Sequence, residues 1–155
     1  MKVLIQRVAR ASVCVGGETV GRTGPGLMAL VGVRTGDTAA DAAQLAQKTV
    51  ALRIFPDAAD RMNLSVEDTG GGILAVSQFT LYAETKKGNR PSFVRAAGPD
   101  LARALYGEYV EALRRALGPD RVATGVFGAS MQVELVNDGP VTVELSTDPA
   151  PARQG

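Results

Sequence analysis

The sequence contains no histidine, no tryptophan and one cysteine among its 155 residues. Because no side chain can act as an imidazole base or ligand, histidine-based catalytic triads and histidine-ligated zinc sites are excluded. Cys14 cannot form an internal disulfide, and its place in the strand-like SVCV predicts a small buried side chain, not a reactive thiol. The fold must therefore depend on an apolar core.

Long apolar runs are also missing. Stretches such as residues 27–31 fall far short of the roughly 20 residues of a membrane-spanning helix, and the first ten residues alternate in polarity, unlike a signal peptide. We therefore expect a cytoplasmic protein without a membrane partner. The net charge of +1 gives no overall attraction to nucleic acid, but it leaves room for a local basic patch.

The residues that are present suit one domain, since 45% are hydrophobic and no linker or internal repeat divides the chain. Strands are predicted at residues 2–9, 11–15, 26–33, 73–81, 121–126, 130–136 and 141–145. Two helices are predicted, one from about Thr38 and one between Gly98-Pro99 and Gly118-Pro119. The predicted fold is an α/β domain of residues 1–145, with mixed, largely antiparallel β-sheets covered on one side by two helices, followed by a flexible tail at 146–155.

Both predicted helices carry an apolar stripe that we assign to the core. Thr38 and Asp41 form a variant of the capping box at the start of the first helix. The stripe of this helix consists of Ala42, Leu45, Ala46, Thr49 and Leu52. The stripe of the second consists of Leu101, Leu105, Tyr109, Ala112, Leu113 and Ala116.

The stretch SQFTL at residues 77–81 places Ser77, Gln78 and Thr80 around Phe79. In an alternating strand the two hydroxyl groups would lie on opposite faces, unless the strand ends or bulges there. By itself the pattern favours a solvated strand end over a reactive site. No carboxylate pair or metal-ligand cluster stands out elsewhere, so no metal and no cofactor are expected.

The stretch KKGNRPSFVR at residues 86–95 contains four cations and no acid: Lys86, Lys87, Arg90 and Arg95. Such a loop can hold phosphate groups even on a nearly neutral protein. A plain solvated loop fits the same pattern, and both interpretations stay open.

The stretch VNDGPVT at residues 136–142 separates two alternating runs. Asn, Asp, Gly and Pro tolerate the dihedral angles of a tight reversal, so the residue types favour a hairpin turn. The alternative is a fixed Gly-Pro corner that presents backbone carbonyl groups to a ligand outside the strand.

Several stretches in the same order resemble the D-aminoacyl-tRNA deacylase family: SQFTLYA at 77–83, KGNRPSF at 87–93, ATGVFGASMQV at 123–133 and LVNDGPVT at 135–142. The resemblance extends from residue 1 to about 145. It implies a homodimer that hydrolyses the ester between a D-amino acid, or glycine mischarged on tRNA-Ala, and the 3′-terminal adenosine of tRNA. The partners implied are a second copy and the 3′ end of aminoacyl-tRNA, and not DNA.

The resemblance also assigns roles to residues. It implies a cis bond between Gly139 and Pro140, and insertion of this pair into the pocket of the partner subunit, where it would exclude L-aminoacyl groups. Arg7 would hold the corner through its guanidinium group. Phe127 and Met131 would flank the adenosine, although both also fit an apolar core.

For the reaction, the resemblance leaves two interpretations of the catalytic stretch Ser77, Gln78, Phe79 and Thr80. Thr80 could be a nucleophile, but no base to activate it is visible. Alternatively, the ribose 2′-hydroxyl assists, backbone N–H groups around Gln78 and Phe79 stabilise the oxyanion, and Ser77 helps to hold the substrate. We favour the second interpretation. A non-catalytic RNA-binding dimer and a different esterase are the alternative functions.

Overall fold

The computed structural model describes residues 1–153, and within them β1 (Lys2–Val15) is the strand with the most partners. It pairs antiparallel with β2 (Glu18–Thr23), β3 (Gly26–Gly32) and β8 (Gln132–Ser146). Parallel pairing then links β3 to β6 (Gly72–Ser77) and β6 to β7 (Val122–Thr124). The strand order is β2-β1-β3-β6-β7 with β8 beside β1, which confirms the predicted mixed sheet.

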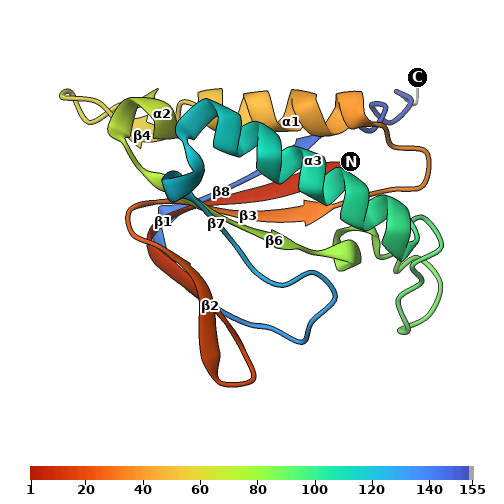
Figure 1. Cartoon of the computed structure of the whole chain (residues 1–155). Coiled ribbons are helices and arrows are strands. Elements are labelled where there is room, and N and C mark those ends of the chain that lie inside the picture. The colour runs from red at the N-terminus through yellow and green to blue at the C-terminus, as the bar shows by residue number, and fades with distance from the viewer. Residues whose placement is uncertain (154–155) are drawn as a thin grey trace.

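Two long helices, α1 (Ala39–Ala51) and α3 (Pro99–Leu117), lie side by side on one face of this sheet, as Figure 1 shows. Both predicted ends of α3 are confirmed, with proline in the first turn and Gly118 as C-cap at φ +92°. At the start of α1, the backbone N–H of Thr38 donates to Oδ2 of Asp41 at 2.8 Å, as the capping box requires.

The remaining elements are short. Strands β4 (Phe55–Pro56) and β5 (Met62–Leu64) form a separate ladder, and α2 (Val66–Thr69) follows. The sequence prediction omitted α2, although Ser65 and Asp68 cap it in the same way as at the start of α1. Two single turns of 3-10 helix, η1 (Phe79–Tyr82) and η2 (Pro119–Arg121), follow β6 and α3.

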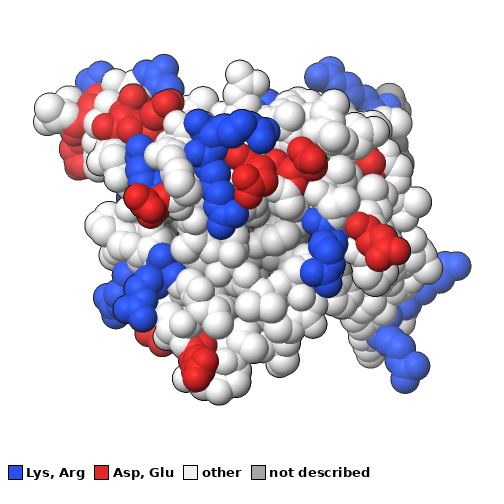
Figure 2. Space-filling model, viewed as in Figure 1, with Lys and Arg blue, Asp and Glu red and all other residues white. Residues whose placement is uncertain are grey.

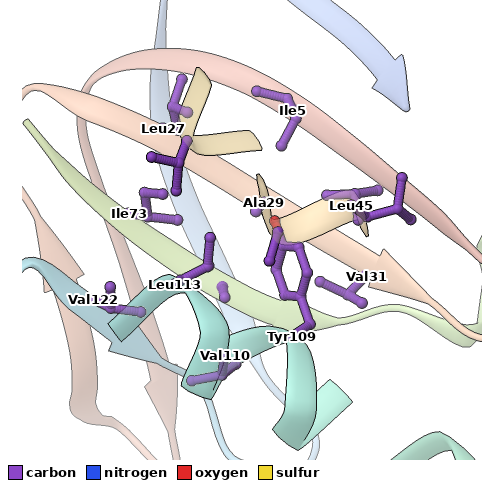
Figure 3. Packing of buried hydrophobic residues seen from close by; sticks show 14 of the residues in the cluster. Ile5, Leu27, Ala29, Val31, Leu45, Ile73, Tyr109, Val110, Leu113 and Val122 are labelled. Carbon is purple, nitrogen blue, oxygen red and sulfur yellow. The ribbon is translucent and has the colours of Figure 1, made fainter. Parts of the chain in front are cut away.

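The main core lies between the sheet and the two helices, and Figure 3 shows Leu45 from α1 and Tyr109 and Leu113 from α3 directed at the strands. A second cluster on the other face of the sheet contains Met28 and Leu74. Because β3 contributes to both, its continuous apolar run is buried on both faces.

The predicted stripe of α1 is confirmed at Ala42, Leu45, Ala46 and Thr49, whereas Leu52 is the half-buried C-cap. The stripe predicted for α3 is partly wrong. Leu105, Tyr109 and Leu113 are buried as predicted, whereas Leu101 is 37% exposed and Ala116 is exposed. The helix also buries Tyr106, Val110 and Leu117. Turning the larger apolar side chains toward the sheet, and an alanine toward solvent, removes more apolar surface from water.

The interpretation of NDGPVT as a hairpin turn is wrong. Residues on both sides belong to β8 and pair with the same neighbour, β1, in one antiparallel direction. Gln6 pairs with Thr142 and Val8 with Asn137, so the chain between them bulges from the strand without reversing it. Turn-forming residue types cannot distinguish a bulge from a hairpin, because both need similar local dihedral angles.

Three local predictions also need correction. Cys14 is half-buried, with Sγ 3.4 Å from Oγ1 of Thr19, because its neighbour Val13 takes the inward position. The strand predicted to residue 81 ends at Ser77, where η1 begins, and the strand predicted at 121–126 covers only residues 122–124. Gly16 and Gly17 form the turn between β1 and β2, with positive φ at both residues.

The start of the expected tail makes specific contacts. The amino nitrogen of Met1 lies 3.0 Å from Oγ1 of Thr147 and 3.2 Å from Oδ1 of Asp148. The boundary at residue 146 stays a prediction, and residues 154 and 155 lie outside the described part.

Candidate active site

A cleft of about 610 Å³ lies at the carboxyl end of β6, beside the first turns of α3. In Figure 2 the surface below α3 is hollowed and carries few charged side chains. The lining residues are Val31, Val33, Val76, Ser77, Gln78, Phe79, Phe93, Ala96, Ala97, Pro99, Ala102, Tyr106, Phe127, Gly128, Ala129, Met131 and Val133. The structure thus brings together Ser77, Gln78, Phe79, Phe127 and Met131 from the predicted site.

The cleft offers polar groups but no charged side chain. Among its lining residues, only Ser77, Gln78 and Tyr106 have a side-chain O–H or N–H. The hydroxyl of Tyr106 donates to the carbonyl of Ala75 at 2.9 Å, and burial raises the pKa of Tyr106 to about 12. Tyr106 is therefore neutral and already hydrogen-bonded at neutral pH, so it is not suited to act as a base.

The end of β6 changes which groups face the cleft. The backbone N–H of Gln78 donates to the carbonyl of Val31 at 2.7 Å, so it is not free to bind an oxyanion. Phe79 begins η1, and the first N–H groups of a helical turn have no acceptor within that turn. Phe79 therefore supplies the better backbone donor of the two that we expected.

Thr80 is exposed and is not among the lining residues of the cleft. Its hydroxyl contacts the side-chain amide of Gln78. An amide is not a base, so this contact gives Thr80 no means of activation.

The aromatic residues of the cleft are held in fixed orientations. The rings of Phe79 and Phe93 meet edge to face at 5.0 Å. Phe127 lies 6.0 Å from the ring of Tyr106, and the guanidinium of Arg103 lies over it at 4.7 Å. Sequence reasoning missed Tyr106 and Arg103, although their spacing on α3 puts them on neighbouring turns.

The predicted basic loop divides into two parts. Backbone hydrogen bonds of 2.7 and 2.9 Å between Glu84 and Ser92 close its base, and Lys86, Lys87 and Arg90 extend into solvent. Figure 2 shows basic side chains projecting at the lower right, where Figure 1 places this loop. Arg95 differs from these three cations, because its Nη1 lies 3.7 Å from Oε1 of Glu84.

The bond between Gly139 and Pro140 is cis, as the family resemblance implied. Arg7 holds the backbone beside it: Nε donates to the carbonyl of Asp138 at 3.0 Å, and Nη1 donates to that of Ile54 at 2.7 Å. The guanidinium therefore bonds to the backbone next to the corner, and the role of Arg7 in substrate binding stays a prediction.

Asn137 closes the bulge from the other side, a role that sequence reasoning missed. Its Oδ1 accepts a hydrogen bond from the N–H of Val141 at 3.0 Å, and its Nδ2 donates to Oγ1 of Thr142 at 3.0 Å. The signal was present in the motif, because asparagine side chains often bond to backbone a few residues ahead.

The Gly-Pro corner does not reach the cleft of its own chain. Gly139 and Pro140 are exposed and do not line it. Arg7 pairs with Leu27 near the start of β3, whereas Ser77 pairs with Val31 near the end of β3. Four residues of extended strand separate these positions, or roughly 13 Å.

The described residues contain no group of three or more His, Cys, Asp or Glu side chains placed to hold a metal ion. Within residues 1–153, no helix combines the length and apolar character that crossing a membrane requires.

The fold and the cleft define a small α/β protein with a largely apolar cleft whose lining includes aromatic rings and no charged side chain. A model of the D-Tyr-tRNA(Tyr) deacylase family matches residues 4–146, so the chain belongs to this family. It shares 54% identity over 147 residues with a D-aminoacyl-tRNA deacylase of Syntrophobacter fumaroxidans, covering 95% of this chain and 97% of the relative. The corresponding enzyme of Paracidovorax citrulli is 58% identical over 149 residues, covering 96% and 95%.

Solved structures agree in fold. A chain described as a c-Myc DNA unwinding element binding protein superimposes with a TM-score of 0.91 at 42% identity, covering 97% of this chain and all of the other. A probable eukaryotic D-amino acid tRNA deacylase gives a TM-score of 0.83 at 20% identity, covering 93% and 97%. The activity is thus that of a D-aminoacyl-tRNA deacylase, a hydrolase that acts on aminoacyl-tRNA.

Proposed function

We propose that the cleft binds the 3′-terminal adenosine and its aminoacyl group, and that Gly139-Pro140 of a second copy closes it. The observation that carries this proposal is the position of the corner. Gly139-Pro140 is braced by Arg7 and Asn137 but exposed, and it does not line the cleft of its own chain. A rigid exposed backbone corner is suited to act on the site of a neighbour.

A second copy also suits the surface around the corner. Within the described part of the chain, β8 pairs with β1 alone, so its other edge is open over a strand of 15 residues. Val133 and Val136 on this strand are each 38% exposed. Long open edges with apolar side chains are usually covered in native proteins. A homodimer with β8 at its interface would cover this edge.

Chirality would be judged by exclusion. A stiff backbone wall beside the α-carbon leaves space for a D side chain and collides with an L side chain. Glycine has no side chain to exclude, so glycyl-tRNA would also be hydrolysed. Attraction to D side chains would discriminate less, since an apolar pocket separates analogues by only about 1 to 3 kcal/mol per methylene.

For the ester hydrolysis, we infer that the ribose 2′-hydroxyl assists and that Thr80 is not the nucleophile. The cleft lining has no side chain that acts as a base at neutral pH, and Thr80 lies outside it. The N–H of Phe79 would bind the developing oxyanion, and Ser77 would hold the substrate. One such donor contributes about 3 kcal/mol, and an aminoacyl ester is already activated.

The rest of the tRNA end would be held by apolar and basic groups. Phe127, which contacts Tyr106 and Arg103, would flank the adenine, with Met131 beside it in the cleft. Lys86, Lys87 and Arg90 would contact phosphates of the preceding nucleotides, which carry no sequence information.

The primary test compares hydrolysis of D-Tyr-tRNA and L-Tyr-tRNA by the whole chain. Rapid release of D-tyrosine alone is expected. Equal release of both would contradict exclusion by the corner. Cleavage of a free D-aminoacyl ester as fast as of the tRNA ester would indicate a different esterase.

The cross-subunit arrangement is tested by mixing two inactive variants. In Gly139→Val, a Cβ would lie 2.8 Å from Cγ2 of Val141 at a φ of +134°, so the corner is distorted. In Ala129→Trp, the larger side chain fills the cleft. After unfolding and refolding together, about a quarter of the parent activity should return, because half of the dimers have one intact site of two. No gain on mixing would show that each corner serves its own chain.

A further inference from the structure

Besides its 3.2 Å contact with the amino nitrogen of Met1, the carboxylate of Asp148 joins three segments that are distant in the sequence. Its Oδ1 accepts a hydrogen bond from the hydroxyl of Tyr82 at 2.9 Å and lies 3.6 Å from Nε of Arg34. Its Oδ2 lies 3.8 Å from Nη2 of Arg95. The side chain is only 14% exposed, so solvent screens these interactions less than on an open surface.

Each of the three contact residues is close to a residue of the cleft wall. Arg34 directly follows Val33, and Arg95 directly precedes Ala96. Tyr82 is the last residue of η1, the turn that begins with the proposed oxyanion donor. Asp148 therefore contacts three residues whose segments also contribute to the cleft wall, and it does not line the cleft itself.

Backbone hydrogen bonds already join two of these segments. The N–H of Ala97 donates to the carbonyl of Val33 at 2.9 Å, and that of Thr35 donates to Arg95 at 3.1 Å. The end of η1 is attached differently. Tyr82 is 2% exposed, its ring lies 5.7 Å below the guanidinium of Arg95, and its hydroxyl ends on Asp148.

We propose that Asp148 is a positioning residue of the deacylase reaction, which fixes η1, and with it the N–H of Phe79, against the cleft wall. Asp148 lies beyond β8 and beyond residue 146, where the family match ends. The carboxylate acts through Tyr82 and does not touch the substrate. The inference rests on the proposed location of the substrate in the cleft.

The test measures kcat and KM for D-Tyr-tRNA in Asp148→Asn, Tyr82→Phe and the double variant. A misplacement of about 1 Å can cost roughly 100-fold, so a partial release of η1 should lower kcat by about tenfold in each single variant. KM should stay within about twofold, since the substrate contacts remain. The double variant should lose no more than the worse single variant, because both changes break one linkage.

Asp120→Asn is the matched control, because Asp120 is an exposed acid in η2, remote in sequence from all three segments. It should leave kcat and KM unchanged. Melting curves are recorded for every variant, and kinetics are measured well below each Tm. Tyr82→Phe keeps the ring and its packing, so it reports on the linkage even where Asp148→Asn lowers stability.

Unchanged kcat in both single variants would overturn the inference, whatever happens to Tm. Additive losses in the double variant would also overturn it, as would a change in KM alone, which would place the effect on tRNA binding and not on η1. A parent protein that does not distinguish D-Tyr-tRNA from L-Tyr-tRNA would reject the proposed function, and this inference with it.

Discussion

Arg7 provides the most direct test of how the corner is held. Its side chain is 12% exposed, and its guanidinium donates to two backbone carbonyls, those of Asp138 and Ile54. A lysine at this position retains the charge, but its single ammonium group cannot reproduce the planar fork that serves both carbonyls. Arg7→Lys therefore removes at least one bond, and Arg7→Ala removes both.

The expected magnitudes follow from these two bonds. A hydrogen bond to a charged group contributes about 1.5 to 3 kcal/mol, and the one to Asp138 belongs at the lower end because it is at the surface. Arg7→Ala should lower the free energy of unfolding by about 3 kcal/mol. The bond to Asp138 contributes about 1.5 kcal/mol to holding the corner. Its loss should lower the ratio of kcat/KM for D-Tyr-tRNA to kcat/KM for L-Tyr-tRNA by about tenfold.

The assay determines kcat/KM for D-Tyr-tRNA and L-Tyr-tRNA, together with urea denaturation of each variant. Arg10→Lys is the control, because Arg10 is an exposed arginine on the same strand, and it should change neither quantity. If Arg7→Ala lost stability but kept the parent ratio of D to L hydrolysis, Arg7 would not hold the corner, and the reasoning would be refuted.

Four further predictions follow from other contacts. Thr80→Ala should keep turnover within about tenfold of the parent in a single-turnover assay, whereas a loss on the order of 10⁶ would identify a nucleophile. The double variant Lys86→Ala with Lys87→Ala should reduce the slope of log Kd for tRNA against log salt by about 1.4, and an unchanged slope would remove these lysines from the interface. Thr49→Val should lower the free energy of unfolding by about 1 to 3 kcal/mol, because it leaves the buried hydroxyl of Tyr109, now 2.9 Å from Oγ1 of Thr49, without a partner. Adding Tyr109→Phe should restore part of the lost free energy of unfolding. A further decrease of this free energy in the thermal or urea melt would contradict the explanation by the hydrogen bond. Hydrogen bonds from Thr38 hold the pKa of Asp41 below its ordinary value. Burial raises the pKa of Asp148, but the hydrogen bond from Tyr82 lowers it, and this pKa also lies below its ordinary value. A depressed carboxyl pKa stabilises the fold above the ordinary value near 4, so urea melts should show stability falling below about pH 4, and Asp41→Asn should reduce that fall.

Local signals in the sequence determined much of the fold. Gly98-Pro99 and Gly118-Pro119 set both ends of α3 because proline suits a first turn and glycine a C-cap. Thr38 and Asp41 set the start of α1, and the apolar run at residues 26–33 forms the strand β3. The rotation of α3 was not predictable in the same way, because it depends on which side chains fill the space above the sheet.

The motifs SQFTL and NDGPVT could be identified as candidate site stretches from the sequence, and the family resemblance assigned them to one reaction. Their geometry could not be read from residue types. Ser77 ends a strand because η1 follows it, and the N–H of Gln78 is occupied because β3 lies beside it. Only the neighbouring strand decides which backbone donor stays free.

The sequence by itself determined the absence of histidine chemistry and the presence of the Gly-Pro pair, since these depend only on residue identity. The tertiary structure decided that NDGPVT bulges from a continuous strand and does not reverse the chain, because only pairing with β1 on both sides distinguishes the two. It also decided that the corner does not line its own cleft and that Asp148 contacts Tyr82, Arg34 and Arg95. Contacts between residues so distant in sequence arise from the packing of the whole sheet, and no local pattern encodes them.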